Sequence, residues 1–431
     1  MAAAALNNGV YLPKPIIISA ALTKQGQRFL SSIAIAPSSE PLLSKFVSSS
    51  SKAVTLSTLN HLLSTDTTHP HLSSLALPLY MKITQVPWFS WNSKLVSCVI
   101  ASLYKQGRIQ EAETLVSETI STMCLKERDL VSFYCNLINS VAKVKSKTGF
   151  AYAHAHLREL LCTSSSTFVR KRAYESLVGG LCVMGLPYEA ENLINEMGQL
   201  GLKPSLFEFR SLVEGYGRLG LFRDMLQSVF QMENSGFPLD TISSNMVLSS
   251  YGLHGELTEM VNWLQRMKAL GISLSIRTYN TVLNSCQTFR LLLQDLKSVP
   301  ISLNDLILVL GDDEALLVQE LAGNQVLDEM MTWNSLESEL DLHGMHVSTS
   351  YLVMLLWMEE LRLRFNDGKY EIPAEMRVVC GIGKHSSIRG DSPVKGMVRE
   401  ILVRARSPLR IDRKNIGCFI AKGKTVVDWL C

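Results

Sequence analysis

Acidic residues are nearly absent from the start of this 431-residue chain. Residues 1–65 contain one acid, Glu40, and one arginine, Arg28, among many serines and alanines. Transit peptides are rich in serine and poor in acids, and the scarcity of arginine favours a plastid over a mitochondrion. The composition therefore predicts a transit peptide and a disordered N-terminus over residues 1–50, followed by a helical cap over residues 51–92. The expected location is the chloroplast stroma, with the mitochondrion as the alternative.

Paired cysteines and long apolar runs are also missing. The nine cysteines include no C-x-x-C pair, which argues against a structural zinc site and against a disulfide framework. The apolar stretch 16–22 is too short to cross a bilayer, and no other run reaches the required length. We therefore expect no metal site of standard spacing and no membrane span. Cys380, beside a glycine-rich segment, is the cysteine expected to be most open to oxidation.

Net charge is low but unevenly distributed. The whole chain carries only +3, whereas residues 376–431 hold twelve Lys or Arg against four Asp or Glu. Residues 301–341 hold ten acids and neither Lys nor Arg. The basic end favours salt-dependent contact with phosphates. The acidic stretch is either a solvated face or a partner of the basic end, and residues 291–335 are expected to form an acidic helical linker.

What the chain does contain is a repeat with a period of 35 residues. Self-similarity at such a period indicates stacked supersecondary units. The series are Met197, Met232 and Met267; Gly185, Gly220 and Gly255; Gly201, Gly236 and Gly271; and Leu177, Leu212, Val247 and Val282. They predict an α-α solenoid over residues 93–290, clearest in units 171–205, 206–240 and 241–275.

Each unit has the pattern of a helical hairpin. Apolar residues spaced by three and four form one helix face, and Gly185 stands where the turn needs a positive φ. Gly201 and Pro204 end the second helix of the unit. A fourth copy starts at Ile276 and then decays, while weaker copies precede residue 171.

This pattern resembles the pentatricopeptide repeat family, in segments such as ENLINEMGQLGLKPS and RTYNTVLNSC. The resemblance implies that stacked first helices face RNA, and that the fifth and last residues of a unit read one base. Only the pair Asn245 and Ser275 matches the family's code, and this pair favours a pyrimidine. The base-reading candidates are Glu175 with Ser205, Arg210 with Asp240, and Asn245 with Ser275, together with Asn280 in the decayed copy.

The last quarter carries two further motifs. The segment LDLHG (340–344) is followed about forty residues later by VVCGIGKHS (378–386). An amphipathic helix is expected over 349–364 with Ser348 as its cap, and a second over 392–402 with Pro393 in its first position. Segments 416–420 and 424–427 are expected to be closing strands. The order β-α-β-α-β predicts a small α/β sandwich over residues 336–431.

These motifs resemble the small MutS-related (Smr) domain, whose members bind nucleic acid and in several cases cut it. The resemblance makes Asp341 and His343 the candidate catalytic pair, since an aspartate can orient an imidazole for proton transfer. Cys380 and Ile382 replace the Thr and Trp common in the plant form. The nucleic-acid-binding candidates are Gly381, Gly383, Lys384, His385, Ser386, Arg389 and Lys395.

Together the two parts predict an organellar RNA-binding protein whose repeat array positions a Smr domain on single-stranded RNA, a plastid transcript or an rRNA. In one version the Smr domain is an endoribonuclease, with Mg²⁺ as its candidate cofactor. In a second version it binds RNA without cutting it. The alternative is a non-catalytic scaffold whose helical repeats bind a stromal protein.

Overall fold

The computed structural model describes residues 22–34, 38–64, 70–122, 126–323, 330–334, 337–367, 373–382 and 392–430. The described chain divides into two compact units, one ending at Phe237 and the other starting at Pro238. The boundary falls within the repeat unit 206–240, so that unit 241–275 lies in the same compact unit as the C-terminal sheet.

The first compact unit begins with packed helices. The rings of Phe29 and Phe46 stack at 3.9 Å, and Leu43 and Leu59 are fully buried. The prediction of a disordered segment is therefore wrong for residues 24–34 and 40–49, because apolar side chains spaced by three and four give these helices a buried face. The helices are α1 (Lys24–Ala34), α2 (Glu40–Ser49), α3 (Lys52–Leu62), α4 (Pro70–Ser73) and α5 (Ala76–Ile83).

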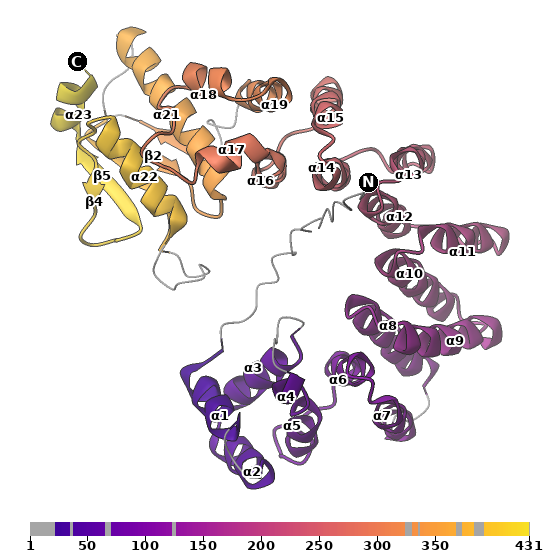
Figure 1. The fold of residues 1–431 in the computed structure, drawn as a ribbon. Coiled ribbons are helices and arrows are strands. Elements are labelled where there is room, and N and C mark those ends of the chain that lie inside the picture. Colours follow the sequence, from indigo (N-terminus) through magenta and orange to yellow (C-terminus); the bar gives the residue numbers. More distant parts are fainter. Residues whose placement is uncertain are drawn as a thin grey trace, which may run out of the picture. The chain divides into compact units, whose positions relative to one another are not determined.

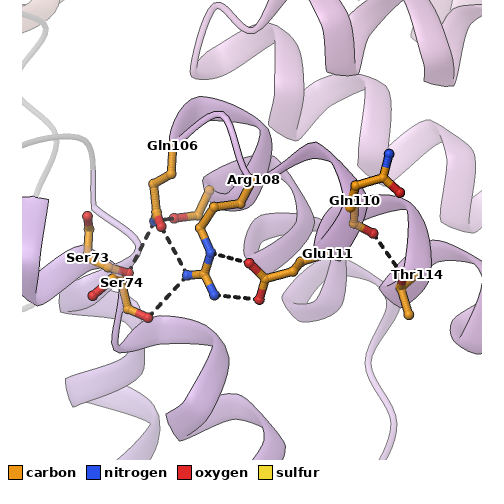
Figure 2. Close-up of polar contacts among 8 residues, drawn as sticks. Ser73, Ser74, Gln106, Arg108, Gln110, Glu111 and Thr114 are labelled. Carbon is orange, nitrogen blue, oxygen red and sulfur yellow. Dashed lines mark hydrogen bonds and ion pairs between the residues drawn. The ribbon is translucent and has the colours of Figure 1, made fainter.

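A polar cluster joins these helices to the first hairpin of the array (Figure 2). Arg108 donates to both carboxylate oxygens of Glu111, at 2.7 and 2.6 Å, and to the Ser74 carbonyl at 3.3 Å. Gln106 donates to the Ser73 carbonyl at 3.2 Å. The hydrogen bond from Arg108 lowers the pKa of Glu111, so the carboxylate stays charged where the two helix groups meet.

Four helical hairpins follow, as the repeat predicted. Their turns use a left-handed residue: Gly107 (φ +74°), Gly185 (φ +87°), Gly220 (φ +73°) and, in place of a glycine, Lys145 (φ +59°). The predicted positive φ at the repeat glycines is thus confirmed. The hairpins are α6 (Ser93–Lys105) with α7 (Ile109–Thr122), α8 (Glu127–Lys143) with α9 (Lys147–Thr163), α10 (Thr167–Met184) with α11 (Pro187–Gln199), and α12 (Leu206–Arg218) with α13 (Phe222–Asn234).

The first helices of these hairpins, α6, α8, α10 and α12, lie in one row and the second helices in another (Figure 1). Side-chain hydrogen bonds tie the first row together. Asn136 on α8 donates to Ser93 on α6 at 2.8 Å, and Asn139 donates to Ser176 on α10 at 3.5 Å. The first helices therefore form a continuous surface within this unit.

The second compact unit opens with the hairpin of unit 241–275 and the decayed fourth copy. Here the predicted linker is packed helix, since Tyr351 donates to the Pro300 carbonyl at 2.5 Å and Arg404 to the Val299 carbonyl at 2.5 Å. The helices are α14 (Thr241–His254), α15 (Leu257–Ala269), α16 (Ile276–Ser285), α17 (Gln287–Leu292), α18 (Leu303–Val309) and α19 (Asp312–Ala322).

The remainder is a five-stranded sheet with helices, in the order β1-β2-β3-β5-β4. β2 and β3 are parallel, with Asp341 opposite Val379, and the other neighbouring pairs are antiparallel. Side chains of Leu340, Val378 and Phe419 are buried. The elements are β1 (Met331–Trp333), β2 (Glu337–Asp341), α21 (Val347–Asp367), β3 (Glu375–Val379), α22 (Pro393–Arg404), β4 (Arg410–Ile411), β5 (Cys418–Lys422) and α23 (Gly423–Leu430).

Several local predictions for this part need correction. β1 lies inside the segment predicted as linker and pairs with β2. Residues 424–427, predicted as a strand, belong to α23, because a four-residue apolar run does not distinguish strand from helix. α21 starts at Val347, one residue before the predicted Ser348 cap. The second prediction of a helix start is confirmed, with Pro393 first in α22 and Ser392 capping it.

No helix in the described ranges is both long enough and apolar enough to cross a membrane.

Candidate nucleic-acid interface

Asp341 and His343 lie together at the carboxyl end of β2. Nδ1 of His343 is 2.7 and 2.6 Å from the two oxygens of the Asp341 carboxylate. The His343 backbone N–H also donates to the same carboxylate at 2.9 Å. This geometry favours a proton on Nδ1 and leaves Nε2 as the acceptor. The His343 side chain is 72% exposed and that of Asp341 36%, so the pair can exchange a proton with a bound substrate.

Gly381, in the second motif (378–386), lies next to the Asp341–His343 pair. It has φ +74°, and a Cβ placed there would lie 3.9 Å from the Cβ of His343. Lys395, in the first turn of α22, is half-buried, and its charge acts on the nearby Cys380 thiol. Of the predicted contact residues, Gly381 therefore lies near the pair. The other five, Gly383, Lys384, His385, Ser386 and Arg389, lie outside the described residues.

Cys380 is a buried residue at the end of β3, and burial raises the pKa of its thiol to about 12. Because the thiolate is the reactive form, the expectation that this cysteine is open to oxidation is wrong. Sequence proximity to a glycine loop did not show that the side chain points into the core.

A metal would need ligands beyond those present here. Among the described residues, no group of three or more His, Cys, Asp or Glu side chains is arranged to hold an ion. The Asp341 carboxylate is already hydrogen-bonded to His343.

The last residues of the predicted base-reading pairs are all helix caps. Ser205 accepts from the Phe207 N–H at 3.2 Å at the start of α12. Asp240 accepts from the Ser243 N–H at 2.9 Å, and Ser275 from the Thr278 N–H at 3.3 Å. The sequence singled out these residues through the resemblance, and the structure shows that their side chains also end the loops between units.

The fifth residues differ from one another. Glu175 on α10 forms an ion pair with Arg172 at 2.8 Å. Arg210 is half-buried on α12, in a different compact unit from Asp240. Asn245 on α14 is buried and donates to Ser275 at 3.3 Å, while its Oδ1 has no hydrogen-bond partner within the described chain. The side chains of the predicted pair Asn245 and Ser275 are thus in direct contact.

Asn280, the base-reading candidate of the decayed copy, makes a tertiary contact. Its Oδ1 accepts from the His346 N–H at 3.0 Å, and Asn284 lies 2.6 Å from Nδ1 of the same histidine. His346 follows the LDLHG motif, and α16 packs against α21. The Asn280 acceptor therefore holds the start of α21, a tertiary contact 66 residues along the chain.

Sequence reasoning missed one aromatic side chain, Phe207 on α12. It is 47% exposed, and a Cβ placed at Gly179 on α10 would lie 3.2 Å from its ring. Gly179 is one helical turn after Glu175, so the ring lies beside a predicted base-reading position. The 35-residue repeat could have indicated this position, because Ile242, 35 residues after Phe207, is also an exposed apolar residue.

Comparison with known proteins decides the family. A family model described as "PPR repeat" matches residues 172–202 and 242–272. The pentatricopeptide repeat-containing protein At2g17033 of Arabidopsis thaliana is 52% identical over an alignment of 441 residues, which covers 99% of this chain and 87% of that protein. This chain belongs to the pentatricopeptide repeat family. The predicted repeat architecture is thereby confirmed.

Other members of the pentatricopeptide repeat family are more distant. The Arabidopsis thaliana protein At5g48730, named as chloroplastic, is 22% identical over 46% of this chain and 38% of its own length. The structure of the pentatricopeptide repeat protein PPR10 in complex with an 18-nt psaJ RNA element is 18% identical, with a TM-score of 0.40. It covers 89% of this chain, and this chain spans 53% of the PPR10 chain.

Proposed function

We propose that this pentatricopeptide repeat protein binds single-stranded RNA in an organelle, the chloroplast rather than the mitochondrion. Its hairpin array holds the strand, and its C-terminal sheet unit is a Smr-type domain that cleaves RNA. The observation that supports cleavage is the exposed Asp341–His343 pair beside Gly381 at the ends of the parallel strands β2 and β3. The carboxyl ends of parallel strands are where α/β folds gather ligands.

The proposed reaction is hydrolysis of a phosphodiester. His343 Nε2 takes a proton from a water molecule, whose oxygen attacks the phosphorus. The P–O bond to the leaving nucleotide breaks, the leaving oxygen takes up a proton from solvent water to become a hydroxyl, and His343 then returns its proton to solvent. Asp341 holds the imidazole in position and stabilises the imidazolium that forms, as a carboxylate beside a catalytic histidine can.

Base contact by the array is proposed at Phe207, Asn245 and Ser275. An exposed aromatic ring offers a stacking surface for a base, and Asn245 with Ser275 is the pair to which the family resemblance assigns a pyrimidine. We expect Phe207→Ala to weaken RNA binding by about 5–150-fold, from the roughly 1–3 kcal/mol of one stacked base. Phe230→Ala is the matched control, because Phe230 is 56% exposed on α13, a second helix of a hairpin.

The test of cleavage uses the full chain with labelled single-stranded RNA, with and without Mg²⁺, over a salt series. Asp341→Asn and His343→Ala should each lower the cleavage rate by about 10²-fold or more while RNA binding is unchanged. His156→Ala on α9 is the histidine control. RNA binding without any cleavage by the wild type would remove the nuclease part of the proposal. Absence of RNA binding, together with salt-insensitive binding of a stromal protein, would replace it with the scaffold function.

A further inference from the structure

The C-terminal sheet unit has a basic pocket that lies away from the Asp341–His343 pair. It encloses about 550 Å³ between the end of α22 and the edge strand β4. Arg399, Arg406 and Arg410 line it, and no acidic residue is among the lining residues. Its apolar wall includes Val403, which is 62% exposed, and the buried ring of Phe419.

The arginines are available to a ligand. Arg399 and Arg406 are exposed, and their side chains have no hydrogen bond or ion pair with any part of the chain the structure describes. Arg410 donates to the backbone carbonyls of Ser407 and Leu409, at 2.6 and 2.9 Å. Those bonds fix its position without neutralising its charge, so three positive charges share one pocket.

Arg406 also adopts an unfavourable backbone conformation. Its φ is +51°, and its N–H donates to the Val403 carbonyl at 3.0 Å where α22 ends. Glycine is the usual residue at such a helix end. A non-glycine residue held in this conformation points to a functional use of its side chain, and the pocket provides one.

The chemistry of the pocket matches a nucleotide. Guanidinium groups bind phosphate oxygens in a forked geometry, and an apolar wall beside them can take the face of a base. The volume is within the range of small-ligand pockets. An acidic peptide could also neutralise the arginines, but it would have no use for the adjoining apolar wall.

The pocket lies on the same sheet as the proposed catalytic pair. Ile411 on β4 pairs with Phe419, Phe419 with Val378, and Val378 with Leu340, next to Asp341. Three interstrand steps separate the two sites, or about 14 Å from a spacing of about 4.8 Å. A single RNA strand can therefore reach both.

We propose that this pocket binds one phosphorylated nucleotide of the RNA strand, with Arg399 and Arg406 on the phosphate and the Val403 wall against the base. The site rests on the proposed RNA function and adds a second anchor to it. A second anchor fixes which phosphodiester bond lies at His343.

The test measures binding of AMP by calorimetry and of single-stranded RNA over a salt series, both with the full chain. Arg399→Ala/Arg406→Ala should abolish saturable AMP binding, weaken RNA binding by at least about fivefold, and reduce the salt slope by about 0.7 for each phosphate that is no longer neutralised. Arg413→Ala/Lys414→Ala is the matched control, because it removes two exposed charges from the β4–β5 turn outside the pocket. Val403→Trp fills the pocket without changing its charge and should also abolish AMP binding.

Equal reductions of RNA binding in the arginine pair and the control pair would overturn the pocket, since only total charge would then matter. Retained AMP binding in Val403→Trp, or a preference for a glutamate-rich peptide over AMP, would also overturn it. If the wild type binds no RNA at all, the proposed function is wrong. The AMP measurement then shows independently whether the pocket binds a nucleotide. Melting curves show whether each variant is folded.

Discussion

Arg406 and the repeat glycines share a left-handed backbone conformation, but the energetic consequences of replacing them are opposite. Arg406 has φ +51° and Gly255 has φ +77°, with no other atoms near the position of its missing Cβ. We expect Arg406→Gly to stabilise the chain by about 0.5–1 kcal/mol and Gly255→Ala to destabilise it by a similar amount. Urea unfolding of the two variants and the wild type measures both changes.

A loss of stability in Arg406→Gly would show that the arginine side chain contributes to the fold. In that case its conformation would have a structural reason, and the strain would no longer point to a binding pocket. A gain in stability together with a loss of nucleotide binding would support the pocket.

Glu375 makes the stability of the sheet depend on pH. Its carboxylate accepts from Lys422 at 2.7 Å and from Arg377 at 2.6 Å, and these hydrogen bonds lower its pKa. A carboxyl with a lowered native pKa contributes stability above its unfolded pKa of about 4.3, and loses it as the pH falls through the native value. Glu375→Gln should therefore unfold more easily than the wild type at pH 7, and the difference should vanish in acid. A difference that persists unchanged at about pH 3 would contradict this.

At the scale of helices, one acidic side chain of the predicted linker has a defined partner. Glu314 on α19 is buried, and its two oxygens accept from the Thr288 and Phe289 N–H groups at 2.9 Å each, at the start of α17. We expect Glu314→Ala to cost about 1–2 kcal/mol, as loss of a helix cap does. Hydrogen exchange at the two amides should become faster. Asp312→Ala, an exposed acid in the same first turn, is the control and should leave that exchange unchanged.

The contact between α16 and the start of α21 gives a second prediction at this scale. Asn280→Ala removes the acceptor of the His346 N–H, and a backbone group without its partner costs about 1–3 kcal/mol. We expect lower stability of the second compact unit and no change in RNA base preference. Arg277→Ala, at an exposed position on the same helix, is the stability control. A changed base preference in Asn280→Ala would restore this residue to the base-reading set.

For the molecule as a whole, the N-terminal helices limit where a transit peptide can be removed. Phe29 on α1 stacks on Phe46 of α2, and α2 packs against α5. A cut between α1 and Ser51 would separate these partners and expose buried side chains. We therefore predict processing before Lys24, to be checked by N-terminal sequencing of protein from isolated chloroplasts. A mature N-terminus between residues 35 and 51 would show that α1 belongs to the precursor alone.

Local pattern in the sequence determined the repeated part of this protein. A 35-residue step and glycines at fixed offsets specify hairpins, because apolar spacing and positive φ act over a few residues and need no distant partner. The same holds for Ser392 and Pro393 at the start of α22 and for the Asp341–His343 contact, which joins residues two apart. Composition alone was less informative, because it predicted a disordered transit peptide over the residues that form α1 and α2.

Tertiary structure decided what distant residues do to one another. Asn280 contacts a histidine 66 residues away, the Cys380 side chain is buried in the core, and the predicted acidic linker forms packed helices and one strand of the sheet. The three arginines of the pocket come together only where a helix end meets an edge strand. Such contacts depend on long-range packing, and neither spacing nor charge in a single sequence specifies them.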